Sequence, residues 1–374
     1  MKSRTLQLKQ EGQSIWLDNI QRRELHDGTI QHMINQDGVC GITSNPTIFM
    51  NAVTKSDDYD DQIALLTGKK KSAEEIYYHI TVDDIRDAGN LFLPVYRETQ
   101  QQDGYVSIEL NPQLAFDIEG SIREAREVLK QIGLPNIMVK VPGTPEGISV
   151  ARQLIAEGIN VNITLLFSPD RYKQVAVAYI EGLEQRAEQG KDISRVRSVA
   201  SFFISRIDSK VDKQIDEICK KDESVLSLRG AAATTIAKVT YRICENLFSG
   251  ERFGVLKEKG AHIQRVLWAS TSTKDPSYRD VKYVEDLVAD NTINTLPPKT
   301  IDAFRDHGIA RQTITEGIDD APGILKRLEQ SGVSLEGVYN ELQDEGVRAF
   351  ETSYLELLDA IEKKGKALLP QAAG

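Results

Sequence analysis

Short apolar runs alternate along the chain with longer segments of helical period. Eight such runs recur, at residues 14–20, 38–45, 104–110, 136–142, 160–167, 198–205, 265–270 and 291–296. Between them, apolar residues three or four positions apart predict amphipathic helices, clearest in residues 113–132 and 229–247. Strands that alternate with helices favour parallel strands joined by helical crossovers.

Eight strand–helix units predict an α/β fold, a TIM-type (β/α)8 barrel with additional helices. An open doubly wound sheet is the alternative, but no G-x-G-x-x-G motif follows the first run. The connections 46–103 and 206–264 are long enough to require extra helices. The tail from about Gly317 has a helical apolar pattern, formed by Val347, Phe350, Tyr354, Leu357, Leu358 and Ile361.

We therefore predict a single domain over residues 1–374. Residues 1–316 form the barrel with its inserted helices, and residues 317–374 form a C-terminal helical extension packed on it. A separate C-terminal domain is the alternative, but no Pro/Gly/Ser-rich linker precedes the tail. The sequence does not decide whether the C-terminal helices cover the barrel mouth or form a dimer contact.

Composition and charge restrict the partners. The chain has 46 Lys and Arg against 56 Asp and Glu, a net charge of −10. This balance argues against nucleic acid or a membrane surface as a partner and leaves room for a local basic pocket. The N-terminus lacks the apolar segment of a secretory signal, so we expect a cytoplasmic protein. The three cysteines are far apart and the histidines scattered, so we expect reduced thiols and no metal.

Polar side chains occur late in several runs, on what would be the inner face of the barrel. Side chains alternate between the two faces of a strand, so Lys140 lies opposite Val139 and Val141. In a barrel these late positions converge at the C-terminal mouth, where such enzymes carry their sites. The predicted ring consists of Asp18, Asn45, Glu109, Lys140, Asn162, Thr164 and Ser201.

Each of these residues also has a structural interpretation. A single Ser, Thr or Asn in a strand is usually satisfied by a neighbour, and Asp18 fits a capping role as well as a catalytic one. Lys140 is harder to explain in this way, because a lysine is rarely buried without a partner. Its structural alternative is an ion pair with Glu109 or Asp18 that only holds the barrel together.

A lysine in a closed pocket has a specific chemistry. Desolvation favours the neutral amine, which attacks a ketone or aldehyde and forms a Schiff base. Proton transfers then require carboxylates, and Glu109 and Asp18 are the available pair. No cofactor is required. Arg206, and the hydroxyl-rich segment from Ser270 to Lys274, each follow a predicted strand and suit a phosphate monoester. The alternatives are a pairing of Arg206 with Asp208, and a simple turn at "STST".

Several ordered motifs, from about Asp18 to Pro298, resemble the signatures of the transaldolase family, in its longer bacterial subgroup. They are "GITSNPTIF" (41–49), "VKVPGTPEGI" (139–148), "GINVNITLLFS" (158–168), "SFFISRID" (201–208), "LWASTSTKDPSY" (267–278) and "YVEDLVADNTINTLPP" (283–298). The resemblance implies a TIM-type barrel and transfer of a dihydroxyacetone unit from sedoheptulose 7-phosphate to glyceraldehyde 3-phosphate. The products are erythrose 4-phosphate and fructose 6-phosphate, in the non-oxidative pentose phosphate pathway.

The resemblance also implies roles for individual residues. Lys140 forms the Schiff base, Glu109 moves protons through a water that Thr164 helps to hold, and Asp18 is the acid/base for bond cleavage. The implied substrate-binding residues are Asn45, Asn162 and Ser201 for hydroxyls, Phe203 for pocket shape, and Arg206 and Ser270 for phosphate. In shorter members an arginine follows the serine of the seventh-strand motif. Here Lys274 takes that place, and a lysine offers only a point charge.

Two other functions remain possible from the residues alone. A Schiff-base aldolase would share the lysine and release free dihydroxyacetone to water. A non-catalytic barrel that binds sugar phosphates is disfavoured, because Lys140, Glu109 and Asp18 are all present. We expect small sugar phosphates as the partners, and either a monomer or a homodimer.

Overall fold

The computed structural model describes residues 3–369, and its centre is a closed barrel of eight parallel strands in chain order. This confirms the predicted TIM-type barrel, and each predicted run contains one strand. The strands are β1 (Gln13–Leu17), β2 (Val39–Thr43), β3 (Tyr105–Glu109), β4 (Ile137–Pro142), β5 (Val161–Leu166), β6 (Ser198–Phe203), β7 (Arg265–Ala269) and β8 (Thr292–Leu296).

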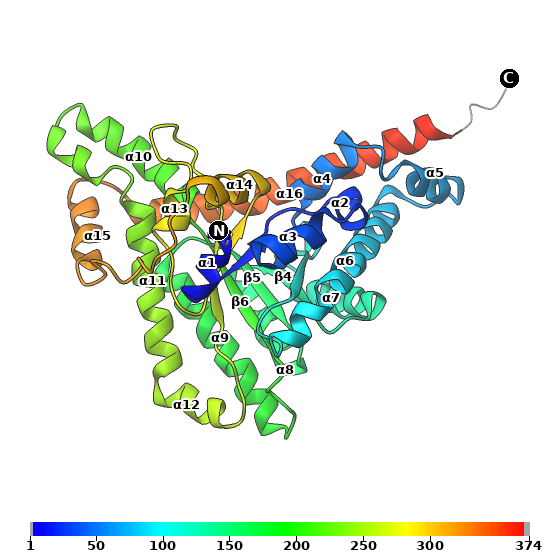
Figure 1. Cartoon of the computed structure of the whole chain (residues 1–374), viewed down its shortest axis with the longest axis horizontal. Coiled ribbons are helices and arrows are strands. Elements are labelled where there is room, and N and C mark those ends of the chain that lie inside the picture. The colour runs from blue at the N-terminus through cyan, green and yellow to red at the C-terminus, as the bar shows by residue number, and fades with distance from the viewer. Residues whose placement is uncertain (1–2, 370–374) are drawn as a thin grey trace.

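Helices surround the barrel (Figure 1). Up to β6 they are α1 (Arg4–Gln10), α2 (Arg22–His26), α3 (Thr29–Asp37), α4 (Pro46–Lys55), α5 (Asp60–Gly68), α6 (Ala73–Glu98), η1 (Pro112–Leu114), α7 (Ile118–Ile132), α8 (Pro145–Glu157) and α9 (Pro169–Glu188). After β6 they are α10 (Ser205–Cys219), η2 (Glu223–Leu228), α11 (Ala232–Ser249), α12 (Glu251–Glu258), α13 (Lys282–Glu285), α14 (Pro298–His307), α15 (Ala321–Gln330) and α16 (Leu335–Leu368). Both long connections contain extra helices, as predicted.

Local sequence signals set the boundaries of the crossover helices. At α8, Thr144 accepts a hydrogen bond from the Gly147 amide, and Pro145 occupies the first helical position. The helix ends at Gly158, whose φ of 89° is a left-handed conformation that glycine adopts without strain. These caps fix where α8 begins and ends, so the chain returns to the barrel at a defined point for β5.

The strand register places the central polar residues side by side. Glu109 of β3 is paired with Lys140 of β4, and Lys140 with Asn162 of β5. Deeper in the barrel, the Trp16 ring fills the interior against Gly41, where a Cβ atom would lie 2.6 Å from the indole. Glycine at position 41 therefore lets a large ring close the middle of the barrel and leaves the polar residues above it, toward the C-terminal ends of the strands.

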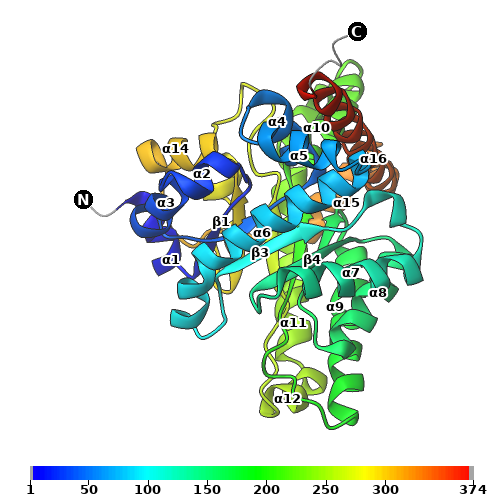
Figure 2. The same cartoon turned by 90° about the vertical axis from the view of Figure 1, so that its right-hand side faces the viewer.

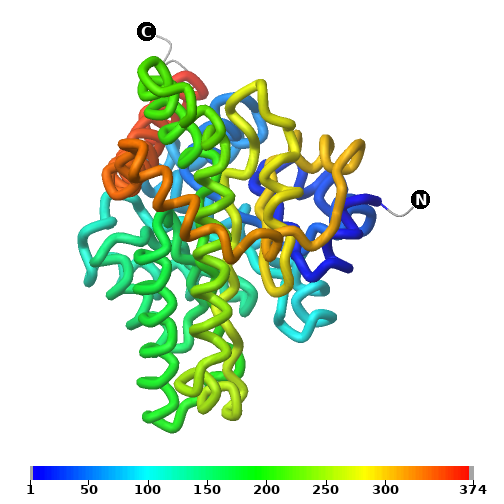
Figure 3. Tube along the Cα trace, turned by 90° about the vertical axis from the view of Figure 1, so that its left-hand side faces the viewer, coloured from blue at the N-terminus to red at the C-terminus, as the bar shows by residue number. Residues whose placement is uncertain are grey.

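The C-terminal tail packs on the barrel rather than away from it. Helix α16 contacts α4, α5, α6 and α10, so it runs beside the C-terminal ends of several strands (Figures 1 and 2). Lys210 of α10 forms ion pairs of 2.6 Å with Glu341 and Glu345, and Lys364 pairs with Asp60 of α5. Helix α15 lies against α11 (Figure 3). The division at residues 316/317 within a single domain stays a proposal.

None of the helices within residues 3–369 is long and apolar enough to cross a membrane.

Candidate active site

Lys140 lies near the C-terminal end of β4, and its side chain is buried inside the barrel mouth. The residue is 4% exposed. Its Nζ atom lies 2.8 Å from Oε2 of Glu109 and donates a 2.9 Å hydrogen bond to the Ser44 carbonyl. The ion pair that the sequence offered as a structural alternative is therefore present. The ion pair does not exclude a catalytic role, because a proton can pass between the Lys140 amine and the Glu109 carboxylate at this distance.

The environment of Glu109 makes its carboxyl easier to protonate than an exposed one. Burial raises the pKa of the Glu109 carboxyl above its usual value, and the neighbouring Lys140 opposes that shift. A small cavity of about 20 Å³ lies beside these two side chains and is also lined by Leu165, Val347 and Phe350. Its size matches a single water molecule.

Asp18 follows directly after β1 and faces the same mouth. Its Oδ1 atom accepts a 2.8 Å hydrogen bond from the Thr43 hydroxyl, which also contacts the Thr295 hydroxyl at 2.6 Å. Burial raises the pKa of the Asp18 carboxyl, and Lys140 is the largest opposing influence. Neither threonine was among the predicted site residues, although strand alternation places Thr43 on the same face as Asn45.

A cavity of about 260 Å³ at the mouth brings together most of the predicted site residues. Its lining includes Asp18, Asn45, Lys140, Thr164, Ser201, Phe203, Arg206, Ser270 and Lys274. Glu109 lies on the other side of Lys140 and lines the smaller cavity. The C-terminal ends of seven strands (β1, β2 and β4 to β8) and three helices (α4, α10 and α16) thus contribute to the larger cavity.

Asn162 lies below the cavity instead of lining it. It is fully buried, donates a hydrogen bond to the Ser107 hydroxyl at 3.1 Å, and accepts one from the Ser201 hydroxyl at 2.6 Å. These contacts orient Ser201, which does reach the cavity. Thr164 lines the cavity, and its Oγ1 atom is buried without a hydrogen-bond partner among residues 3–369. Asn45 caps α4 by accepting a hydrogen bond from the Ile48 amide.

The far end of the cavity is positively charged. Arg206 lies in the first turn of α10 with its guanidinium 5.2 Å from the centre of the Phe203 ring, and it forms no ion pair within the described part of the chain. It therefore does not pair with Asp208, whose oxygens bind the Ala233 amide and the Tyr283 hydroxyl. Lys274 donates to the Ser272 hydroxyl at 3.0 Å. Burial and the charge of Arg206 both lower the pKa of Lys274.

Two residues at the mouth hold a left-handed backbone conformation without being glycine. Leu165 has a φ of 60° at an irregularity in the pairing of β5, and Ser270 has a φ of 55° just after β7. Such conformations cost of order 1–3 kcal/mol and concentrate at functional sites. The Ser270 hydroxyl lies 2.9 Å from that of Ser205, at the start of α10. This contact places Ser270 beside the Arg206 segment.

Phe350 is the site residue that sequence reasoning missed. It lies on α16, lines both cavities, and places its ring centre 5.8 Å from the Lys140 amine. The apolar spacing of the tail identified Phe350 only as a packing residue. Nothing in the local sequence indicates that the last helix crosses the mouth, so no sequence signal could have found this contact.

Comparisons with known proteins agree with this geometry. Residues 15–361 match the family described as Transaldolase/Fructose-6-phosphate aldolase. A transaldolase of Trichodesmium erythraeum is 44% identical over 98% of both chains. A transaldolase of Thiobacillus denitrificans is 45% identical over 94% of this chain and 97% of its own. An Arthrobacter transaldolase is 44% identical over 97% of both chains.

A family match over most of the chain, and relatives of this identity over nearly their whole length, agree with a barrel that carries a buried lysine between two acids. The chain therefore belongs to the transaldolase family.

Proposed function

We propose that this transaldolase-family enzyme moves a dihydroxyacetone unit between sugar phosphates through a Schiff base on Lys140. One observation carries the proposal. The Lys140 amine is buried, lies within ion-pair distance of Glu109, and opens onto a cavity that also holds Asp18 and Arg206. The donor is sedoheptulose 7-phosphate and the acceptor glyceraldehyde 3-phosphate, with erythrose 4-phosphate and fructose 6-phosphate as products. The reaction belongs to the non-oxidative pentose phosphate pathway.

The Lys140–Glu109 pair prepares the nucleophile. Transfer of one proton from Lys140 to Glu109 leaves a neutral amine beside a neutral acid, and the burial that raises the pKa of the Glu109 carboxyl makes it a better acceptor for that proton. The amine adds to the substrate ketone, and its proton passes to the new alkoxide to give a carbinolamine. Glu109 then protonates the departing hydroxyl, and water leaves with formation of the iminium. The one-water cavity beside the pair supports a relay through water.

Asp18 then acts on the bond to be broken. As a carboxylate it takes the proton of the hydroxyl on the leaving carbon. The carbon–carbon bond breaks as that carbon becomes an aldehyde, and the electron pair enters the iminium to give an enamine. The acceptor aldose reverses these steps, with Asp18 now returning the proton, and hydrolysis of the imine frees the lysine. The Thr43 hydrogen bond holds the carboxylate in place.

Arg206 and Lys274 supply the charge for the substrate phosphate, and Ser270 supplies a hydroxyl beside them. Ser201 and Asn45 are placed to contact hydroxyls of the bound ketose, with Asn162 fixing Ser201 from below. No step in this scheme needs a cofactor. We further propose a cytoplasmic location, consistent with three free cysteines. We also propose that the enzyme works as a monomer or a homodimer on small sugar phosphates.

The family description also covers aldolases, so water and an acceptor aldose are the two possible fates of the enamine. Borohydride added with fructose 6-phosphate tests the shared step, and we expect one reduced adduct on Lys140. Fructose 6-phosphate with and without erythrose 4-phosphate then tests transfer. We expect turnover only with the acceptor. An adduct on another lysine would refute the site, and equal release of free dihydroxyacetone without acceptor would favour the aldolase.

A further inference from the structure

A second cavity lies at the opposite, N-terminal end of the barrel. Its volume is about 230 Å³, and its lining includes Trp16, Tyr105 and Met138, from β1, β3 and β4. Cationic and imidazole side chains complete it: Arg197 just before β6, Arg265 at the start of β7, Lys257 of α12 and His262. None of these four residues takes part in the reaction proposed above.

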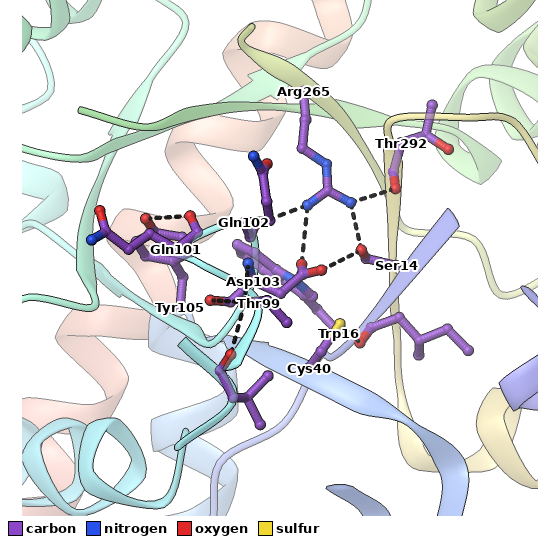
Figure 4. Close-up of polar contacts among 12 residues, drawn as sticks. Ser14, Trp16, Cys40, Thr99, Gln101, Gln102, Asp103, Tyr105, Arg265 and Thr292 are labelled. Carbon is purple, nitrogen blue, oxygen red and sulfur yellow. Dashed lines mark hydrogen bonds and ion pairs between the residues drawn. The ribbon is translucent and has the colours of Figure 1, made fainter. Parts of the chain in front are cut away.

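Arg265 already has a counter-ion (Figure 4). Its Nη1 atom lies 3.0 Å from Oδ1 of Asp103. The Asp103 carboxylate also accepts hydrogen bonds from the Ser14 hydroxyl at 2.7 Å and from the Trp16 indole at 3.2 Å. The charge and acceptor positions of Asp103 are therefore occupied by this cluster. Asp103 thus serves as the counter-ion of Arg265.

Arg197 has no such counter-ion. The residue is 6% exposed and forms no ion pair within residues 3–369. Its Nη1 atom donates to the carbonyls of Ser194 and Val196, at 2.7 and 3.2 Å, but its buried Nε atom has no partner among the described residues. Burial lowers the pKa of the Arg197 guanidinium. Guanidinium groups nevertheless keep their charge in proteins, so this is a buried cation without an anion.

Two further groups suit an anionic ligand. Lys257 is exposed at the rim and forms no ion pair in the described structure. The His262 Nδ1 atom lies 3.0 Å from the side-chain nitrogen of Gln102. With the amide in this orientation, the Gln102 nitrogen donates a hydrogen bond to Nδ1, and the imidazole proton is on Nε2. Burial and Arg197 both lower the pKa of His262, so a neutral imidazole lies beside the guanidinium.

We propose that this cavity, defined by Arg197, Lys257 and His262, binds a small oxyanion of the phosphate class. The Arg197 Nη2 atom makes no hydrogen bond within the described residues and is not buried, so it can donate to a phosphate oxygen, and an exposed lysine adds a point charge. The volume exceeds that of a bare phosphate, so a small phosphate monoester also fits. The site is distinct from the catalytic mouth, and its existence does not depend on the proposed reaction.

Calorimetric titration of the full-length protein with inorganic phosphate tests the proposal, with Arg206→Ala used to remove binding at the mouth. We expect Arg206→Ala to retain one phosphate site, and the added change Arg197→Gln to weaken that site about tenfold or more. Equal phosphate affinity with and without Arg197→Gln would overturn the proposal. If Arg206→Ala binds phosphate with the same number of sites and the same affinity as the native protein, that result instead counts against the proposed phosphate contact at the mouth.

A second variant, at an exposed residue of the cavity, keeps the proposal testable if Arg197→Gln does not fold. In the Arg206→Ala background, Lys257→Gln should weaken phosphate binding about threefold, because one nearby charge is lost. Lys259→Gln, also exposed but outside the cavity lining, is the matched control and should leave the affinity unchanged. Equal effects of the two variants would refute the site. Titration with glycerol 3-phosphate distinguishes a phosphate-only site from one that uses the rest of the cavity for an organic monophosphate.

Discussion

Replacing Glu109 by glutamine separates a catalytic role of the Lys140–Glu109 pair from a structural one. The amide keeps the shape of the side chain but loses the charge and the transferable proton. Lys140 then keeps its hydrogen bond to the Ser44 carbonyl and can donate to the glutamine amide oxygen, but it loses its carboxylate partner. Removing one member of a buried ion pair typically destabilises a protein by about 3–5 kcal/mol, because the other charge is left unpaired.

We therefore expect Glu109→Gln to lower the free energy of unfolding by about 3 kcal/mol, at the lower end of that range because the amide still fills the same space. Since domains are typically stable by about 5–15 kcal/mol, the variant should still fold.

Catalysis should be affected much more than folding. Loss of a positioned acid typically slows proton transfer by about 100-fold or more, and imine formation should slow by that factor. Rapid mixing with fructose 6-phosphate, quenched by borohydride, measures imine formation, and denaturant unfolding followed by circular dichroism measures stability. Glu124→Gln is the matched control, because Glu124 is a partly buried carboxylate that accepts from the Asn111 amide and not from Lys140.

Two results would refute this reasoning. A folded Glu109→Gln variant that forms the imine at the native rate would remove Glu109 from the proton path. A variant that does not fold would show that the pair serves mainly to hold the barrel together.

Three further predictions concern the mouth. Arg206→Ala should raise KM for phosphorylated sugars about tenfold or more with a smaller effect on kcat, since a charge-assisted contact to phosphate is lost. Because burial raises the pKa of Asp18, the acid limb of kcat/KM should lie above the ordinary aspartate value of about 3.9, with activity falling as the carboxylate gains its proton. Phe350→Ala should increase release of free dihydroxyacetone relative to transfer several-fold, because the ring shields the Lys140 amine from water.

Each of these has a matched check by steady-state kinetics. Arg195→Ala removes an exposed cation before β6 and should leave KM unchanged; an equal rise in both variants would exclude Arg206 from the phosphate site. Asp18→Asn should lose the acid limb together with most activity, and an unchanged profile would exclude Asp18 as the base. Phe116→Ala removes an exposed ring and should not alter the product ratio. If Phe350→Ala releases and transfers dihydroxyacetone in the same ratio as the native enzyme, the ring does not shield the amine.

Periodicity in the sequence determined the barrel and the inner-face positions of the polar residues. Alternation along a strand is a local property, so Lys140 and Glu109 could be assigned to one face without knowing their neighbours. Eight strand–helix units then favoured a closed barrel over an open sheet. The relatives confirm the family that the motifs indicated.

Tertiary structure alone decided what closes the two ends of that barrel. Phe350 reaches Lys140 from a helix more than 200 residues further along the chain, and among residues 3–369 Arg265 has an ion-pair partner while Arg197 has none. Asn162 likewise supports Ser201 from below rather than lining the cavity. Such contacts depend on how helices and strand ends pack in three dimensions. Local patterns of polarity carry no information about which distant partner fills, pairs with or covers a given side chain.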